Sequence, residues 1–422
     1  MKNLWLTAVL ICVSGICMAQ LKQLSLSECH SLAEENYPLV KQHDLIAKAG
    51  AFNISNAAKL YLPQVSFSGQ ATYQSQTVNF AEAVGGKLPF SIPALSKDQY
   101  KVQGEISQLI YDGGTGANIR NNAAMNTAVQ QQNLKVSLYA LHERINQLYF
   151  SILLLTQQQV QNNLRKADLQ NLIGKASAAL QNGTAFRSQV NELKAELSNA
   201  ELTGIEFRES KLAYLQMLGV FINKPLDEST DLQVPADFSA LAQNARPELK
   251  LFELRRQAID LQEKQLSTDY TPKLSAFFQG AYGRPTLNFI SNEFGFWYLG
   301  GLRFSWNIGS LYTLQNNRSL LGINRQAIDV EKEVFLFNSK LNLEQENAEV
   351  RKYRAMLVQA DSGLAYRISV KKAAEAQLAN GVITTHEFIS KLNAENLARQ
   401  ALIVNRIQLL RAQYSIKNTL GI

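Results

Sequence analysis

The stretch 38-PLVKQHDLIAKAGAFNISNAAKLYLPQVSFSG-69 has a diverged second copy in the chain, which begins at Pro247. Pro38 and Pro63 match Pro247 and Pro272 under one constant offset. The same offset pairs further residues: Lys41/Lys250, Leu45/Leu254, Ala49/Ala258, Tyr61/Tyr270, Ser66/Ser275, Gln70/Gln279 and Tyr73/Tyr282. Identities at a fixed offset are typical of an internal duplication. We therefore predict two structural repeats, residues 20–230 and 231–422, each with a helix, two strands and a long helical hairpin.

Four segments alternate apolar and polar residues: 62–76, 98–111, 271–284 and 296–309. Such period-two alternation predicts strands. Their apolar faces are rich in aromatic residues, which suits either a sandwich with one solvated face or a barrel in an outer membrane. The strands alone leave both open. In a barrel, the lipid-facing residues would include Phe67, Tyr73, Leu302, Phe304 and Trp306. The loops 77–97 and 285–295 would then lie outside the cell.

Long helices follow each pair of strands. A heptad seam predicts one helix from just after Asp112-Gly113-Gly114 to about Leu180; its residues are Leu134, Leu138, Leu141, Ile145, Leu148, Ile152 and Leu155. A shorter helix, about 188–218, returns beside it. The returning helix is only about half as long as the first, and a helix over residues 40–60 would make up roughly the rest of the length. Asn182-Gly183 and Asn380-Gly381 interrupt the two helical hairpins. We expect each glycine to allow a turn, and Thr184 or Ser188 to cap the next helix.

The N-terminus, 1-MKNLWLTAVLICVSGICMA-19, has the pattern of a secretory signal peptide. Lipidation at Cys17 is the alternative interpretation. Cleavage after residue 19 leaves Cys29 as the single thiol, so no internal disulfide is expected. The net charge of +7 is spread along the chain without a basic run, so nucleic acid is not expected as a partner.

The sequence carries no pattern of catalytic or cofactor chemistry. The four histidines, His30, His43, His142 and His386, do not have metal-ligand spacing. The segment Gly113–Gly116 lacks the lysine of a phosphate loop. We therefore expect no enzyme, no cofactor and no metal site.

Four strands in one chain cannot close a barrel, and an open edge in lipid leaves backbone groups without hydrogen bonds. Copies of the chain must therefore pool their strands; two copies would supply eight and three would supply twelve. The duplicated helix–proline–strand openings, the junction 109-LIYDGG-114 and the two Asn-Gly turns together resemble the TolC-type outer-membrane efflux proteins. The similarity covers nearly all of the chain after the signal peptide.

This resemblance implies an α+β membrane protein. A homotrimer would form a transmembrane β-barrel of twelve strands, continuous with an α-helical coiled-coil barrel that forms a periplasmic tunnel. Outer-membrane lipid, a periplasmic adaptor (membrane fusion) protein and an inner-membrane pump would be its partners. The expected function is a passive exit duct of a tripartite efflux or type I secretion system. The expected location is the outer membrane, with the helical part in the periplasm.

The resemblance also assigns roles to residues near the turns. Asn182, Gly183, Asn380 and Gly381 match the turns that face the adaptor. Some members carry acidic residues six and nine positions after the second glycine, at the periplasmic gate. Those positions are Glu387 and Ser390, and their counterparts in the first repeat are Gln189 and Glu192. A basic residue of those members is replaced here by Ile383, which argues against their gate salt bridge. Glu387 is equally interpreted as a solvated surface residue.

Other functions remain open at this point. The chain could be an adhesive coiled-coil surface protein anchored by its strands, although a stalk needs no duplicated strand pairs. A single-chain porin would need more strands and fewer helices. The adaptor protein itself has a single helical hairpin. The cargo (drug, metal ion or polypeptide) and the class of pump are not specified by the sequence.

Overall fold

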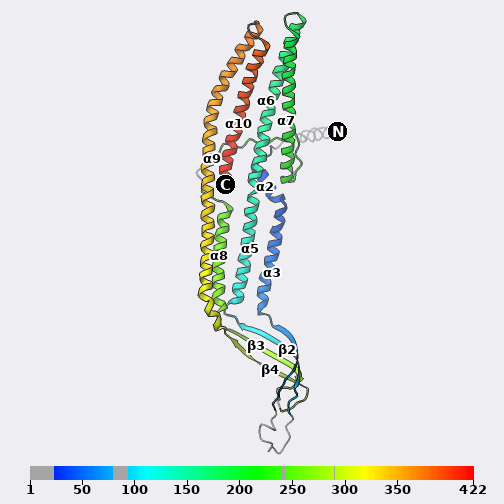
Figure 1. The fold of residues 1–422 in the computed structure, drawn as a ribbon, viewed down its shortest axis with the longest axis vertical. Coiled ribbons are helices and arrows are strands. Elements are labelled where there is room, and N and C mark those ends of the chain that lie inside the picture. The colour runs from blue at the N-terminus through cyan, green and yellow to red at the C-terminus, as the bar shows by residue number, and fades with distance from the viewer. Residues whose placement is uncertain (1–22, 79–93, 239–242, 289) are drawn as a thin grey trace, which may run out of the picture. The chain divides into compact units, whose positions relative to one another are not determined.

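The computed structural model describes residues 23–78, 94–238, 243–288 and 290–422 (Figure 1). The predicted signal peptide, Cys17 and most of the loop 77–97 lie outside these ranges. The elements, in chain order, are α2 (Leu26–Asn36), η1 (Pro38–Lys41), α3 (Gln42–Ala58), η2 (Lys59–Tyr61), β1 (Gln64–Tyr73), β2 (Asp98–Tyr111), α5 (Thr115–Tyr139), α6 (Leu141–Gln181), α7 (Arg187–Ile222), α8 (Pro247–Asp269), β3 (Lys273–Arg284), β4 (Gly295–Ser305), η3 (Ile308–Thr313), α9 (Leu314–Ala379) and α10 (Thr385–Leu420).

The chain forms two compact units, each assembled from separate stretches of sequence. The helical unit comprises the described residues within 1–41, 134–249 and 334–422, and the sheet unit comprises those within 42–133 and 250–333. Each unit therefore draws on both predicted repeats. Pro63 and Pro272 each directly precede a strand, and Pro38 and Pro247 each begin a helical segment. These placements agree with the duplication, which stays a prediction.

The sheet unit contains one antiparallel sheet with the order β1-β2-β3-β4 (Figure 1). The predicted strand 98–111 matches β2, whereas the other three predicted segments extend beyond the strands. The largest difference is at β4, which ends at Ser305. Trp306 therefore lies beyond the strand, where its indole Nε1 donates to the carbonyl oxygen of Tyr270 at 3.1 Å. The turn of the chain into η3, which begins at Ile308, ends the alternation earlier than expected.

The register places most of the aromatic residues of the strands on one side of the sheet. Phe67 pairs with Gly104, Gly104 with Gly280, and Gly280 with Tyr298. We call this side the apolar face; its apolar residues are Val65, Phe67, Gly69, Ala71, Tyr73, Tyr100, Val102, Gly104, Ile106, Leu274, Ala276, Phe278, Gly280, Tyr282, Phe296, Tyr298, Gly300, Leu302 and Phe304. Three polar residues, Asp98, Gln108 and Arg284, lie on the same side near the strand ends. Its large side chains are exposed: 82% for Phe67, 77% for Tyr73 and 86% for Phe296.

The opposite side, the polar face, is held by bonds between strands. Glu105 of β2 accepts hydrogen bonds from Gln279 Nε2 of β3 at 2.6 Å and from Arg303 Nη1 of β4 at 2.9 Å. Phe277 is an aromatic residue on this face. The Arg303 guanidinium lies 4.6 Å from the centre of its ring, and such a cation–π contact suits a ring beside polar groups. Phe277 is therefore compatible with a polar side of the sheet.

Asp112 joins β2 to the helix that follows. Its Oδ1 accepts from the Gly114 N–H at 2.8 Å, and its Oδ2 accepts from the Gly116 N–H at 2.6 Å. The Tyr61 hydroxyl donates to the same Oδ2 at 2.7 Å. Asp112 thus satisfies N–H groups at the start of α5 that no helical carbonyl can reach.

The helical unit is built around the hairpin of α6 and α7, with α2 and α10 packed against it (Figure 1). Five of the seven predicted seam residues are buried: Leu134, Leu141, Ile145, Leu148 and Ile152. The single long helix predicted from just after Gly114 to about Leu180 is instead two helices, α5 and α6. The break is confined to Ala140, whose N–H still donates to the carbonyl of Val136 at 3.2 Å. Local loss of regular geometry at one residue is not visible in a heptad pattern.

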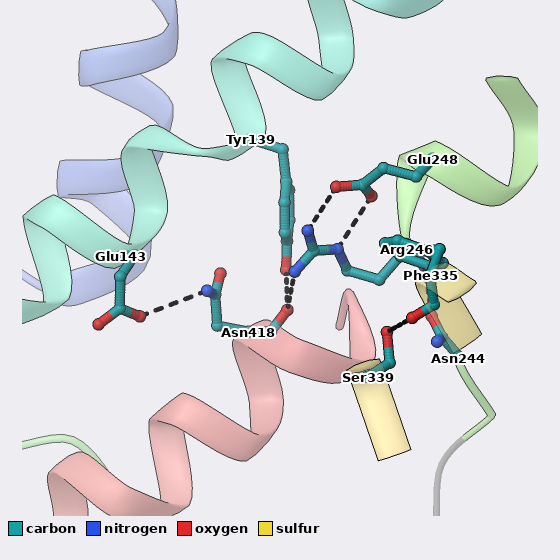
Figure 2. A network of polar contacts seen from close by, with 8 residues as sticks. All are labelled: Tyr139, Glu143, Asn244, Arg246, Glu248, Phe335, Ser339 and Asn418. Carbon is teal, nitrogen blue, oxygen red and sulfur yellow. Dashed lines mark hydrogen bonds and ion pairs between the residues drawn. The ribbon is translucent and has the colours of Figure 1, made fainter. Parts of the chain in front are cut away.

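Arg246 joins the end of α10 to its neighbours in the helical unit (Figure 2). Its guanidinium binds Glu248 through Nε at 2.9 Å and through Nη2, and lies 5.0 Å from the ring centre of Tyr139. The Asn418 carbonyl accepts from the Tyr139 hydroxyl at 2.8 Å and from Arg246 Nη1 at 3.4 Å. These bonds cap the last turn of α10. In the described part of the chain, no helix has the length and hydropathy needed to cross a membrane.

Candidate functional site

The candidate site consists of the two hairpin turns, residues 182–186 and 380–384, which we call the first and second tip turns. They connect α6 to α7 and α9 to α10, and both lie at the same end of the helical unit (Figure 1). Gly183 and Gly381 have φ angles of 72° and 70°. Residues with a Cβ rarely adopt this left-handed conformation. The predicted role of both glycines in turning the backbone fits this geometry.

Both turns use the same backbone hydrogen bonds. In the first, Thr184 N donates to Ala179 O at 2.9 Å and Gly183 N donates to Leu180 O at 3.1 Å. In the second, Val382 N donates to Gln377 O at 2.9 Å and Gly381 N donates to Leu378 O at 3.1 Å. This pair of bonds is the Schellman motif, which closes a helix C-terminus with a glycine. The two turns therefore share one backbone design.

The helices that leave the turns begin differently. Before α10, Thr384 Oγ1 accepts from Glu387 N at 3.2 Å, and Glu387 Oε2 accepts from Thr384 N at 2.8 Å. This reciprocal pair is a capping box. Before α7, Gln189 Oε1 accepts from Phe186 N at 3.0 Å, but Phe186 has no side-chain acceptor to complete the box.

The predicted caps Thr184 and Ser188 do not cap α7. Thr184 Oγ1 instead donates to the Ala179 carbonyl of the preceding helix at 3.0 Å, and Ser188 lies within the first turn of α7. The residue that occupies the cap position is Phe186. A cap preference scale could not have selected it, because phenylalanine offers no oxygen to the helix N–H groups.

The four predicted gate residues have different surroundings. Glu387 is engaged in the capping box, and its bond from the Thr384 N–H lowers the pKa of its carboxyl group. Gln189 takes the corresponding place in the first repeat. Ser390 is exposed on α10. Glu192 Oε1 lies 2.7 Å from His386 Nδ1, so it alone among the four contacts the other hairpin through its side chain.

A mixed apolar and ionic layer below the turns joins the two hairpins. The apolar part contains Leu169, Leu193, Ala200, Ala374, Phe388, Ile389 and Leu392, with Ile383 packed against it. Arg165 Nη2 of α6 donates to Glu196 of α7 at 2.9 Å and to Asn393 of α10 at 2.7 Å. Ile383, which the resemblance places where some TolC-type proteins carry a basic residue, therefore packs against the apolar layer. The sequence did not reveal Arg165 or His386, because their partners are distant along the chain.

Two apolar side chains on the tip turns are exposed. Phe186 is 76% exposed and Val382 is 70% exposed. Neither belongs to the apolar layer below. Within the described residues, no group of three or more His, Cys, Asp or Glu side chains could hold a metal ion. The two tip turns therefore expose apolar and polar side chains on a backbone held by hydrogen bonds.

The sequence matches no protein-family model and no curated protein. Solved structures do match. The outer membrane protein VceC of Vibrio cholerae superposes with a TM-score of 0.67 at 12% identity, over 94% of this chain and 96% of that chain. The outer membrane channel CmeC of Campylobacter jejuni gives 0.64 at 13% identity, over 94% and 85%. The open-state outer membrane channel MtrE of Neisseria gonorrhoeae gives 0.65 at 12% identity, over 94% and 88%. The chain therefore has the TolC-type fold that the sequence predicted.

Proposed function

We propose that the chain forms a passive exit channel in the outer membrane, as a homotrimer that docks onto a periplasmic adaptor and an inner-membrane pump. The observation that carries this proposal is the apolar face of the sheet. Large apolar side chains that stay exposed across four strands need an apolar environment. Lipid supplies it, whereas an adhesive stalk in water does not.

The edges of the sheet determine the assembly. Among the described residues, β1 pairs only with β2 and β4 only with β3, so two strand edges are open. Open edges in a bilayer leave N–H and C=O groups without partners, at a cost of several kcal/mol each. Pairing β1 of one copy with β4 of the next would satisfy both edges. Closure after three copies rests on the resemblance to TolC-type proteins and on the shared fold.

The tip turns are proposed to bind the adaptor. The Schellman motif fixes the backbone at both turns, so exposed side chains there are presented without a large entropic cost on binding. Phe186 and Val382 would supply apolar contact area. Because the sequence carries no nucleotide-binding motif, the energy for transport would come from the pump.

Labelling of single cysteines in intact cells tests the orientation. Glu293 lies between β3 and β4, Ser188 lies next to the first tip turn, and both are exposed. The native Cys29 is fully buried, which keeps its background low. A membrane-impermeant maleimide should label Glu293→Cys in intact cells, and Ser188→Cys only after the outer membrane is permeabilised. Labelling of Ser188→Cys in intact cells would contradict the proposal.

A further inference from the structure

The helical unit contains a half-enclosed cavity of about 440 Å³ that is separate from the tip turns. It is lined by Ser25, Leu26, Ser27 and His30 at the start of the chain, by Tyr139, His142 and Asn146, by Gln233, Pro235 and Ala236, and by Tyr414, Lys417, Asn418 and Ile422. Two of these residues, Tyr139 and Asn418, are shown in Figure 2. A cavity of this size falls in the range of small-molecule sites. Its walls come from four different helices and one extended segment, so they are not one local turn.

The cavity wall carries one ammonium group, that of Lys417. Lys417 contacts the rings of Tyr414 and Phe238, with Nζ 5.5 and 5.9 Å from the ring centres. In the described part of the chain, Lys417 forms no ion pair with a carboxylate. The cavity wall also includes the N-terminal end of α2, where the helix dipole is positive. A helix end would not make a site alone, but here it adds to a free ammonium group.

Two stacked histidines complete this side of the cavity. The rings of His30 and His142 lie parallel, with their centres 4.1 Å apart. His142 Nε2 lies 2.6 Å from Glu34 Oε1, and His30 Nε2 lies 2.8 Å from Asn146 Oδ1. Both partner oxygens accept, so each Nε2 carries a proton. The other ring nitrogen, Nδ1, forms no hydrogen bond in either histidine among the described residues.

We propose that this cavity binds a small organic carboxylate, held by Lys417 and His30 and flanked by the rings of Tyr139 and Tyr414. The ammonium of Lys417 supplies the opposite charge, and a protonated His30 supplies a second charge-assisted donor. The two tyrosine rings offer apolar contact to a carbon skeleton, which favours a carboxylate over an inorganic anion. This site is independent of the proposed transport function.

Binding should be coupled to protonation of His30. Burial, His142 and Lys417 lower the pKa of His30 to about 4, so its ring is neutral near pH 6. An anion beside it favours the charged form and raises that pKa. Affinity should therefore increase as the pH falls from 7.5 to 5.5. The titratable and charged groups around the cavity are Glu34, Tyr139, His142, Glu143, Asp237, Arg246, Tyr414 and Lys417.

Calorimetric titration of the purified full-length protein with sodium benzoate at pH 6 tests this site. We expect saturable binding of one benzoate per chain, and at least tenfold weaker binding by Lys417→Gln. Lys194→Gln is the matched control, because Lys194 is exposed on α7 and lies outside the cavity. It should bind as the wild type does. Absence of saturable binding, or equal affinity in Lys417→Gln, would overturn the proposal.

A second measurement tests the role of His30. The chain has only four histidines, so the signal of ¹³C-labelled His30 can be assigned by substitution. Benzoate should raise the midpoint of its titration, and His30→Gln, which keeps a donor for Asn146, should bind without proton uptake. An unchanged midpoint in saturating benzoate would remove His30 from the site. Inorganic phosphate should bind at least tenfold more weakly; equal affinity would overturn the assignment to an organic carboxylate.

Discussion

The sheet and the tip turns place apolar side chains on the surface in two different ways. On the sheet, one face of four strands is mostly apolar, and the opposite face carries most of the polar residues, which are bonded between strands. At the turns, single residues such as Phe186 and Val382 stand on a backbone fixed by hydrogen bonds. The first arrangement suits a continuous apolar solvent and the second suits a contact with another protein. Substitutions on the sheet should therefore reduce membrane insertion, whereas substitutions at the turns should reduce binding to the adaptor.

The largest expected effect is at the centre of the apolar face. Phe67→Arg would place a charge opposite Gly104, in the middle of the strands. A charge on the lipid-facing side costs about 2–4 kcal/mol per chain near the bilayer midplane. Every copy in the assembly carries the change, so the amount in the outer-membrane fraction should fall strongly.

Ser68→Arg is the matched control for Phe67→Arg, because Ser68 is the adjacent residue on the polar face. It should reach the membrane at nearly the level of the wild type. Immunoblots of separated membranes measure both variants. If Phe67→Arg inserted normally, or if the two variants failed equally, the two faces would not differ in environment.

The next effect is at the second tip turn. Gly381→Val forces a β-branched residue into a left-handed conformation, at a local cost of about 1–2 kcal/mol. Nothing in the described structure crowds the site, so the cost is conformational. We expect assembly and insertion to be near normal, and crosslinking to the adaptor to be lost together with export.

Gly363→Val provides a comparison on α9, where the backbone is helical and the space is also open. This variant should retain adaptor crosslinking. Loss of the assembled protein in Gly381→Val would mean that the glycine stabilises the fold generally. Normal docking by Gly381→Val would show that the turn is not the contact surface.

A smaller effect should distinguish the starts of the two helices that follow the tip turns, α7 and α10. Thr384→Ala removes the cap of α10 and costs about 1 kcal/mol. Phe186→Ala removes no cap, so the start of α7 should be little affected. Hydrogen exchange of the amides in the first turns of α7 and α10 measures both. The assignment of the caps would be contradicted if Phe186→Ala increased the exchange rate at the start of α7 more than Thr384→Ala increased it at the start of α10.

The smallest effect is expected for Glu387→Gln. A glutamine can accept from the Thr384 N–H, as Gln189 accepts from Phe186 N in the first repeat. Hydrogen exchange and adaptor docking should therefore be unchanged. Only cation block or conductance in a planar bilayer should change, and only if Glu387 also lines the gate. An altered helix start in Glu387→Gln would show that the negative charge is needed for the cap.

Local patterns were enough to predict much of the fold. Alternation in 98–111 located β2, and the heptad seam from Leu134 onward marked residues that are largely buried. The glycines of both tip turns could be found because a left-handed residue after a helix leaves a local signature. The ends of the strands could not be predicted from alternation alone, because Trp306 continues the apolar–polar pattern but lies outside β4.

Contacts between distant segments could not be predicted from the sequence. His386 meets Glu192, and Arg165 meets Asn393, although both pairs are far apart in the chain. The cavity near Lys417 also brings residues from both ends of the chain together. Phe186 is a different case, because its cap position is set by the Schellman motif before it and by Gln189 after it, and not by its own side chain.

The pairing of open edges between copies is the central claim, and disulfide crosslinking measures it directly. Gln70→Cys on the polar face of β1 is combined in turn with Trp297→Cys, Leu299→Cys or Gly301→Cys on the polar face of β4. Within one chain, two strands separate these positions, about 14 Å at the usual strand spacing, which is too far for a disulfide. Oxidation of membranes should give covalent dimers and trimers for the pair that is in register, and no larger species, because three copies close the ring. Absence of crosslinks in every pair, or a ladder that continues beyond three chains, would contradict the account.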